Sequence, residues 1–381
     1  MEEGTFGLNT VHIIDCGCVT CLGDSLDTLW QSLLGNTCGF KPVRRFNTDG
    51  YVNNLAGCIA ELDDIPHGKR FGAILEKVCQ RSIQTTADAV LLTATTKDNI
   101  ELHEKYIRDS DKEPVKFSAC SMIDYLAKTL GIGNHALNIN AACASTSSAI
   151  LWGAEMIDNE ETDMVVVFGG DIVSEFVFSG FSALKVMSPD IGRPFDVNRN
   201  GLILGEAAGY AVLMSETKVL KEKRTSLGKI KGWGVSSDAH HITAPDRNGS
   251  GLQRAIHSAL TKASIGADDI TAINGHGTGT VHNDAMEITA FSKVFGDAMP
   301  PVFSIKGAIG HTLGPCGLIE VLVGLRCLQE QIIPPVTGLQ CPEPGIEACV
   351  TMEKTSMNGN YLLTTNSGFG NINTALILEK V

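Results

Sequence analysis

The segment Asn138–Ile139–Asn140–Ala141–Ala142–Cys143–Ala144–Ser145–Thr146–Ser147–Ser148 places one thiol where a strand is predicted to end and a helix to begin. Residues 135–139 alternate as in a strand, and the apolar residues of 149–156 recur at helical spacing. We therefore expect Cys143 near a helix N-terminus, where free amide groups and the helix dipole favour the nucleophilic thiolate. A buried, unreactive thiol is the alternative, because free cysteine is among the most buried residue types.

Two further segments each place a histidine beside glycine after a short apolar strand. The first is Asn274–Gly275–His276–Gly277–Thr278–Gly279–Thr280, and the second is Ser304–Ile305–Lys306–Gly307–Ala308–Ile309–Gly310–His311. Neighbouring glycines let a substrate or another backbone approach the imidazole ring closely. Either histidine alone would more often be structural. A cysteine, two histidines and a lysine together are the groups that thiol-based acyl transfer with histidine assistance requires.

Further motifs extend along the chain: Phe46–Asn47–Thr48, Arg193–Pro194–Phe195–Asp196, Gly205–Glu206–Ala207–Ala208–Gly209 and Asn366–Ser367–Gly368–Phe369–Gly370–Asn371–Ile372–Asn373. With the cysteine and histidine segments, they resemble the β-ketoacyl-acyl carrier protein synthases of the elongating type, over essentially the whole chain. The resemblance implies an α/β fold, the thiolase-like five-layer αβαβα sandwich of two similar halves. Residues 1–220 would form the N-terminal half with the nucleophile and, within residues 25–135, a cap over the acyl pocket. Residues 221–381 would form the C-terminal half with both histidines.

The resemblance also implies a reaction, the decarboxylative Claisen condensation of an acyl thioester with malonyl-acyl carrier protein in fatty acid or polyketide-like biosynthesis. The acyl group would move to Cys143, and His276 and His311 would donate hydrogen bonds to the enolate oxygen. Backbone N–H groups of Cys143 and Phe369 would hold the oxyanion. The other implied roles are a lysine–glutamate pair of Lys306 and Glu287, support by Asp284, pantetheine contacts by Thr278 and Thr280, and a gate at Phe369.

The order of the predicted elements is typical of an α/β protein. Strands are expected at residues 11–16, 89–93, 136–140 and 164–168 in one half, and at 229–235, 270–274, 302–305, 361–365 and 375–378 in the other. Helices are expected at 252–263 and 318–329. This alternation predicts a mostly parallel sheet with crossover helices. By the resemblance, the apolar strand 164–168 would lie beside its twin at the two-fold axis of a dimer, a homodimer because the chain carries a full catalytic set.

The composition of the chain limits which binding partners and which cell compartment are expected. The 381 residues carry a net charge of −13 and no long basic run, so nucleic acid and anionic membranes are poor partners. An acyl carrier protein is acidic and needs a local basic patch, for which the candidates are Lys41, Arg44, Arg45, Lys69, Arg70 and Arg193. The absence of a secretory signal and of a long apolar run predicts a cytoplasmic protein with reduced cysteines. No cofactor is expected, and no metal, since Cys16, Cys18 and Cys21 lack a second ligand pair.

Two other functions stay open. A chain-length-factor-like partner subunit of a heterodimeric ketosynthase would shape the acyl pocket without doing chemistry, although such partners usually lack the cysteine. A thiolase-type or hydroxymethylglutaryl-synthase-type enzyme acting on coenzyme A esters would use different residues around its nucleophile. The sequence departs from the resembled pattern at Asn274–Gly275, Asn283, Pro315–Cys316 and Asn371–Ile372. These departures favour a specialised, polyketide-like role over housekeeping fatty acid elongation.

Overall fold

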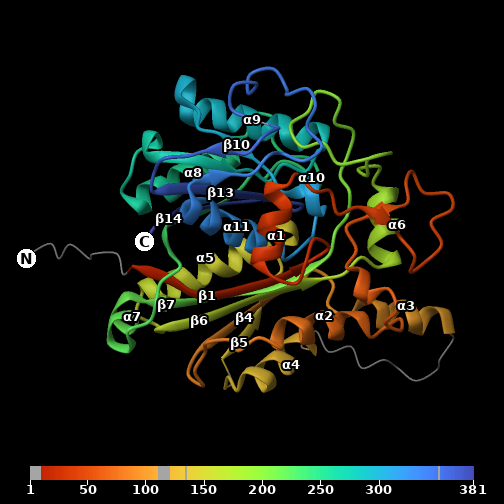
Figure 1. The fold of residues 1–381 in the computed structure, drawn as a ribbon, viewed down its shortest axis with the longest axis horizontal. Coiled ribbons are helices and arrows are strands. Elements are labelled where there is room, and N and C mark those ends of the chain that lie inside the picture. The colour runs from red at the N-terminus through yellow and green to blue at the C-terminus, as the bar shows by residue number, and fades with distance from the viewer. Residues whose placement is uncertain (1–9, 110–120, 134, 351) are drawn as a thin grey trace, which may run out of the picture.

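The computed structural model describes residues 10–109, 121–133, 135–350 and 352–381. Figure 1 shows a large sheet that folds around helices in the middle of the molecule. In sheet order its ten strands are β10 (Val302–Phe303), β9 (Ile270–Asn274), β13 (Tyr361–Gly368), β14 (Ile372–Glu379), β8 (Gly228–Ser237), β1 (Val11–Thr20), β7 (Ala207–Ser215), β6 (Met164–Asp171), β4 (Val90–Ala94) and β5 (Ala136–Asn138).

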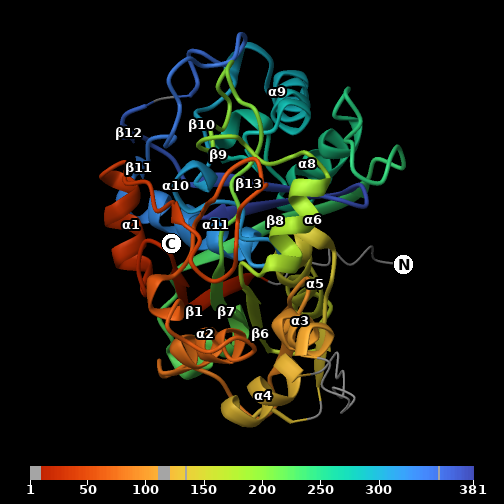
Figure 2. The ribbon, with the colours of Figure 1, turned by 90° about the vertical axis from the view of Figure 1, so that its right-hand side faces the viewer.

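Helices form three layers, one between the two halves of the sheet and one on each outer face (Figures 1 and 2). The middle layer is α5 (Ser145–Asp158) and α11 (Cys316–Glu330), which contact each other and strands of both halves. The outer layers are α8 (Ser250–Ala263) with α9 (Val281–Phe295), and α2 (Arg70–Cys79) with α4 (Ser121–Leu130). The expected five-layer αβαβα sandwich is confirmed.

The two halves of the sheet repeat one topology. Counting strands in chain order within each half, both halves read 3-2-4-5-1 from the outer edge inward. In both, the first two pairings from the edge are parallel and the next two antiparallel. The halves join where β1 pairs antiparallel with β8. A boundary near residue 220 falls in α7 (Glu216–Glu222), between the halves, and its status as a domain boundary stays a prediction.

The prediction of a mostly parallel sheet is wrong, because five of its nine strand pairings are antiparallel. One cause is that β13 turns straight back into β14, so no crossover helix separates them. A second cause is β7, which the sequence analysis did not predict. Its start lies in a motif rich in glycine and alanine, residues with weak strand preference.

The expected place of residues 164–168 at a dimer axis is also wrong. These residues belong to β6, which is hydrogen-bonded to β4 along one edge and to β7 along the other. With both edges occupied, β6 cannot pair with a copy of itself. Its fully buried, apolar character comes from its position inside the sheet. The strand at the open edge of this half is β5.

Shorter elements complete the described chain. They are α1 (Leu26–Leu34), α3 (Ile100–Asp109), α6 (Glu175–Ala183), α10 (Lys306–Ile309), the strand pair β2 (Lys41–Pro42) and β3 (Leu55–Ala56), and the pair β11 (Ile332–Ile333) and β12 (Thr355–Ser356). Among the described residues, no helix is both long enough and apolar enough to cross a membrane. The described cysteines are free thiols.

Candidate active site

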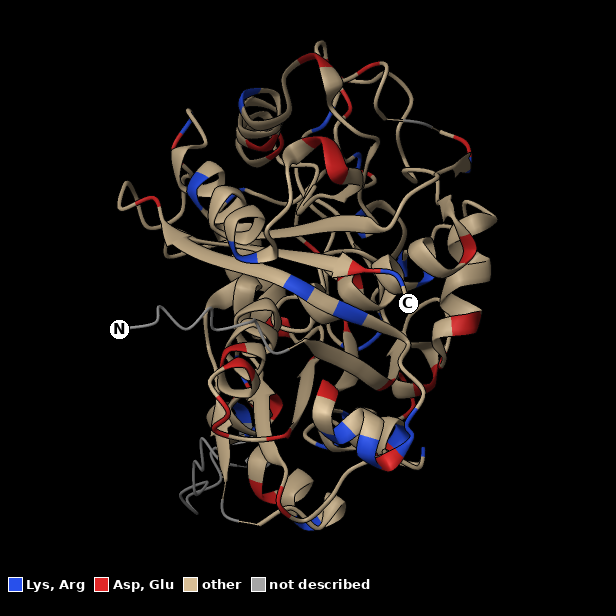
Figure 3. Ribbon diagram, turned by 90° about the vertical axis from the view of Figure 1, so that its left-hand side faces the viewer, with Lys and Arg blue, Asp and Glu red and all other residues tan. Residues whose placement is uncertain are grey.

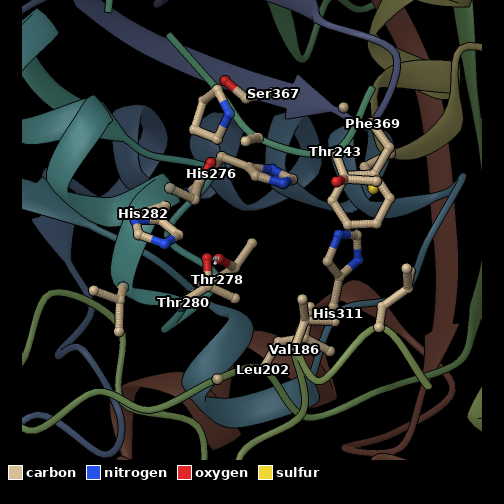
Figure 4. Close-up of a pocket in the computed structure, with 18 of the residues that line it drawn as sticks. Val186, Leu202, Thr243, His276, Thr278, Thr280, His282, His311, Ser367 and Phe369 are labelled. Atoms are coloured by element: carbon tan, nitrogen blue, oxygen red, sulfur yellow. Dashed lines mark hydrogen bonds between the residues drawn. The ribbon is translucent and has the colours of Figure 1, made fainter. Parts of the chain in front are cut away.

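A cavity of about 320 Å³ collects most of the residues singled out in the sequence (Figure 4). Its wall includes Cys143, His276, Thr278, Thr280, His311 and Phe369. Cys143 follows β5, His276 follows β9 and Phe369 follows β13, so the sheet fixes where these side chains start, whereas His311 follows α10. Lys306, Glu287 and Asp284 are buried outside this lining. Of the segment 25–135 expected as a cap, no described residue lines the cavity, and residues 110–120 lie outside the described part.

Cys143 lies in a short 3₁₀ turn (Ala142–Ala144) that leads from β5 into α5. Ala142 before it adopts a left-handed conformation with φ of 50°, which is strained for a residue with a side chain. The thiol is 6% exposed. Burial raises the pKa of Cys143 to about 11, although Lys306 and the backbone amides of Phe369 and Cys143 itself act to lower it. The resting group is therefore a thiol, and the expected helix-stabilised thiolate is wrong for this state.

His311 is a neutral imidazole with a fixed orientation. Its Nδ1 accepts a hydrogen bond from the backbone N–H of Leu313 at 3.0 Å, so the ring proton lies on Nε2. Burial, and then the charge of Lys306, lower the pKa of His311 to about 3. A nitrogen with so low a pKa is a poor base and a ready hydrogen-bond donor.

His276 is held in the same tautomer by different partners. Its Nδ1 lies 3.2 Å from Lys306 Nζ and 3.2 Å from Asn366 Nδ2, and both partners are donors. Burial, then Lys306 and His311, hold the pKa of His276 well below its usual range. The two imidazole rings stand 5.3 Å apart and nearly perpendicular. The site thus offers two neutral N–H donors close to one thiol.

Lys306 pairs with Glu320, not with Glu287 as the resemblance implied. Its Nζ forms a buried ion pair with the Glu320 carboxylate on α11 and also donates to the carbonyl of His276 at 2.6 Å. Burial alone would lower the pKa of Lys306, but Glu320 raises it above its usual range. Glu320 also accepts from Asn366 at 2.5 Å. The pair therefore anchors the positive charge that, in addition to burial, lowers the pKa of both histidines.

Glu287 and Asp284 hold the loop that carries His276. Glu287 accepts hydrogen bonds from the backbone N–H groups of His276 and Gly277 at 2.6 and 2.7 Å. Burial, and then the Asp284 carboxylate, raise the pKa of Glu287 to about 8. Asp284 accepts from the N–H groups of Thr278 and Gly279. A supporting role for both carboxyl groups fits this geometry.

Thr278, Thr280 and Phe369 also line the cavity. The two threonine hydroxyls lie 2.9 Å apart. The ring of Phe369 stacks on Phe181 of α6, with ring centroids 6.0 Å apart. Gly370 beside it has φ of 90°. Position 368 has no room for a larger residue, because a Cβ on Gly368 would lie 2.9 Å from the carbonyl of Ala141. Only one flanking glycine thus supplies the conformational freedom expected for a gate.

Cys143, His276 and His311 each offer one atom within 4.8 Å of the others, a spacing that could hold a metal ion. Metal ligation needs the lone pair of a ring nitrogen. Here the Nδ1 lone pairs already accept protein hydrogen bonds and the Nε2 atoms carry protons. The set therefore suits hydrogen-bond donation to a substrate better than it suits a metal.

Two residues of the site, Glu320 and Asn366, were not predicted from the sequence to have a role of their own. The sequence around Glu320 could have indicated its role, because Glu320 is the one charged residue in the apolar run Leu318–Leu325. A carboxylate inside a buried helix needs a partner, and a search for it would have led to Lys306. Asn366 stood in a quoted motif, but only the fold shows that it contacts His276, Glu320 and Ser147.

Fold and site together define an acyl-transferring enzyme with a cysteine and two neutral histidines. Family models described as "Beta-ketoacyl synthase, N-terminal domain" and "Beta-ketoacyl synthase, C-terminal domain" match residues 77–218 and 227–340. They span more than half of the 381 residues, and the chain belongs to the β-ketoacyl synthase family.

Relatives with recorded names agree with this assignment. The chain is 26% identical to 3-oxoacyl-[acyl-carrier-protein] synthase 2 of Coxiella burnetii, over 97% of this chain and 98% of that protein. It is 35% identical to Nodulation protein E of Rhizobium leguminosarum bv. trifolii, over 66% of this chain and 63% of that protein. Among solved structures, the ishigamide ketosynthase/chain length factor superposes with a TM-score of 0.86 at 25% identity, covering 98% of this chain and all of the other.

Proposed function

We propose that this β-ketoacyl synthase extends an acyl chain by decarboxylative Claisen condensation with malonyl-acyl carrier protein, and that Cys143 carries the acyl group. One observation supports the assignment most strongly. His276 and His311 both have Nδ1 engaged by protein donors, so that each presents a proton on Nε2 beside the thiol. Neutral donors of this kind stabilise negative charge that develops on an enolate oxygen.

In the first half-reaction, the Cys143 sulfur attacks the carbonyl carbon of the acyl thioester. The carbon–sulfur bond to the carrier breaks, and the proton of Cys143 ends on the released carrier thiol. The oxyanion formed on the way would accept hydrogen bonds from the amides of Cys143 and Phe369. Both amides already act on the Cys143 sulfur and lower its pKa, which supports their position beside the reacting atom.

In the second half-reaction, malonyl carrier protein loses CO₂, and the electron pair of the broken carbon–carbon bond forms an enolate. Hydrogen bonds from His276 and His311 would hold the enolate oxygen while its carbon attacks the acyl carbonyl on Cys143. The β-ketoacyl carrier leaves, and the Cys143 thiolate takes up one proton. Lys306 would act through the histidines, because its charge adds to the effect of burial in lowering their pKa values.

An assay of the complete reaction tests this proposal against the thiolase-type alternative. The enzyme is given an acyl carrier protein thioester with either malonyl or acetyl carrier protein, and CO₂ and the carrier-bound product are measured. We expect one CO₂ for each β-ketoacyl product with malonyl carrier and no product with acetyl carrier. Condensation of two acyl groups without loss of CO₂ would contradict the proposal.

The carrier protein would dock around the mouth of the cavity, and the proposed location of the enzyme is the cytoplasm. Two of the candidate docking cations are excluded by burial. Arg45 pairs with Glu206 and Asp63, and Arg70 pairs with Glu101 at 2.6 Å. Figure 3 shows Lys and Arg interspersed with Asp and Glu on one side of the molecule. Lys41, Arg44 and Lys69 stay exposed and remain candidates, as does the partly exposed Arg193, which pairs with Asp190.

We also propose that the chain acts as a dimer, through β5 rather than β6. Within the described residues β5 pairs on one side only, and Leu137 in its centre is 48% exposed. An open strand edge with an exposed apolar side chain favours pairing with another strand. A homodimer is the simpler assembly because this chain has the whole set of reactive groups, and a related second subunit is the alternative.

A charge placed in β5 should weaken this dimer. We expect Leu137→Lys to sediment as a monomer at micromolar concentration where the wild type sediments as a dimer, because the lysine would have to be buried in the interface. Leu220→Lys is the matched control, since Leu220 is exposed on α7, away from β5. A folded, active wild-type monomer at this concentration would disprove the dimer, and activity only with a second, different chain would favour the heterodimer.

A further inference from the structure

His282 stands at the mouth of the cavity with no assigned role. It lines the cavity and is exposed, and its ring has no hydrogen-bond or ion-pair partner in the described part of the chain. Figure 4 shows the ring among the lining side chains, on the same wall as Thr278 and Thr280. A free imidazole that faces a substrate cavity is available to bind a ligand.

The wall that carries His282 leads outward from the reacting groups. His276 at the inner end is 2% exposed and Thr278 is 6% exposed. Thr280 is half-buried, and His282 two residues later is exposed. A substrate arm with its sulfur at Cys143 would therefore pass His276 first, then the threonine hydroxyls, and meet His282 where it leaves the cavity.

The chemical groups along that arm determine which of them could contact His282. A phosphopantetheine arm has uncharged amides along its length and one charged group, the phosphodiester at the end attached to the carrier. Resting on the proposed function, we propose that His282 donates a hydrogen bond to this phosphodiester. His282 would then select thioesters with a phosphorylated arm over thioesters without one.

Three other ionisable side chains line the mouth. The Nδ1 of His241 accepts hydrogen bonds from the N–H groups of Thr243 and Ala244, at 3.2 Å each, so its proton lies on Nε2 and His241 is a competing donor. Asp238 is an acceptor that binds Asn373 at 2.8 Å, and it would repel a phosphate. Lys185, just after α6, is the remaining cation in the lining and the second competing candidate.

The test compares two acyl donors with the same acyl group. Acyl-coenzyme A carries a phosphorylated arm, and the acyl-N-acetylcysteamine thioester stops short of the phosphate. The rate of Cys143 acylation is measured with each donor. The readout is the kcat/KM for acyl-coenzyme A divided by the kcat/KM for the N-acetylcysteamine thioester. In His282→Ala we expect this ratio to fall roughly 10-fold or more, through KM, since hydrogen bonds to charged groups are strong. His282→Gln keeps a neutral donor and should give an intermediate ratio.

His257→Ala is the matched control, because His257 is exposed on α8 and does not line the cavity. It should keep the wild-type ratio. An equal loss with both donors in His282→Ala would show a general effect on the wall and overturn the assignment. A lower ratio in Lys185→Ala or in His241→Ala, but not in His282→Ala, would also overturn it. Failure of wild-type Cys143 to accept an acyl group from any thioester, acyl carrier protein included, would instead overturn the proposed function.

Discussion

Replacing either His276 or His311 by alanine should abolish condensation while leaving much of the acylation of Cys143. Each variant removes one fixed N–H donor from the enolate oxygen, and loss of such a donor costs on the order of 10²–10³ in rate. Acylation depends instead on the amides near the sulfur, which both variants keep. The measurement is single-turnover formation of acyl-enzyme and of β-ketoacyl product with the same protein samples.

The control for these variants is a histidine that carries no proposed role. His257→Ala, on the exposed face of α8, should match the wild type in both half-reactions. If His276→Ala and His311→Ala stay folded and lose acylation and condensation to the same extent, the histidines do not act as enolate donors. A role for the histidines as bases that activate Cys143 would then explain the result better.

Removal of Glu320 should produce the largest loss of stability. Glu320→Ala leaves the Lys306 ammonium buried without its carboxylate partner, and both side chains are almost fully buried. Breaking such a buried pair costs about 3–5 kcal/mol of unfolding free energy. Urea unfolding followed by circular dichroism measures the loss.

Glu222→Ala is the comparison, because its ion pair with Arg224 is about one-third exposed on each side. Exposed pairs contribute roughly 0–1 kcal/mol, so this variant should be nearly neutral. A Glu320→Ala protein as stable as Glu222→Ala would show that Lys306 does not depend on Glu320. The two remaining acceptors of Lys306, the Nδ1 and the carbonyl of His276, would then suffice to hold its charge.

Much of the site could be predicted because each reactive residue lies in a short motif rich in small residues. Cys143, His276 and His311 stand beside small residues that leave room for a substrate, and this requirement is visible locally in the sequence. The partner of Lys306 was not visible in that way. Glu320 follows Lys306 by only 14 residues, but only the packing of α11 brings the two side chains together, whereas Glu287 accepts hydrogen bonds from backbone amides.

Tertiary packing, which short motifs do not specify, also explains the errors in the fold. Strand β9 was predicted with its observed bounds because its apolar run ends sharply at Asn274. The direction of a strand depends on how the chain returns to the sheet, and the β13–β14 hairpin could not be inferred from periodicity. Burial on both faces identified β6 as an inner strand, but periodicity cannot distinguish a sheet neighbour in the same chain from one in a partner.

The pKa of Cys143 shows how burial can outweigh a local effect. A helix N-terminus lowers the pKa of a thiol when water still solvates the site. In this fold the sulfur is buried, and the desolvation of a thiolate raises the pKa to about 11 despite nearby amides and Lys306. The sequence revealed the helix start but not the depth of the site.

The central claim is that Cys143 becomes covalently acylated, and intact mass spectrometry tests it most directly. After incubation with an acyl carrier protein thioester, the wild type and the control Cys327→Ala, a buried thiol on α11, should each gain the mass of one acyl group. Peptide mapping should place that mass on Cys143, and Cys143→Ala should show none. An acyl adduct of equal yield on Cys143→Ala would contradict the account.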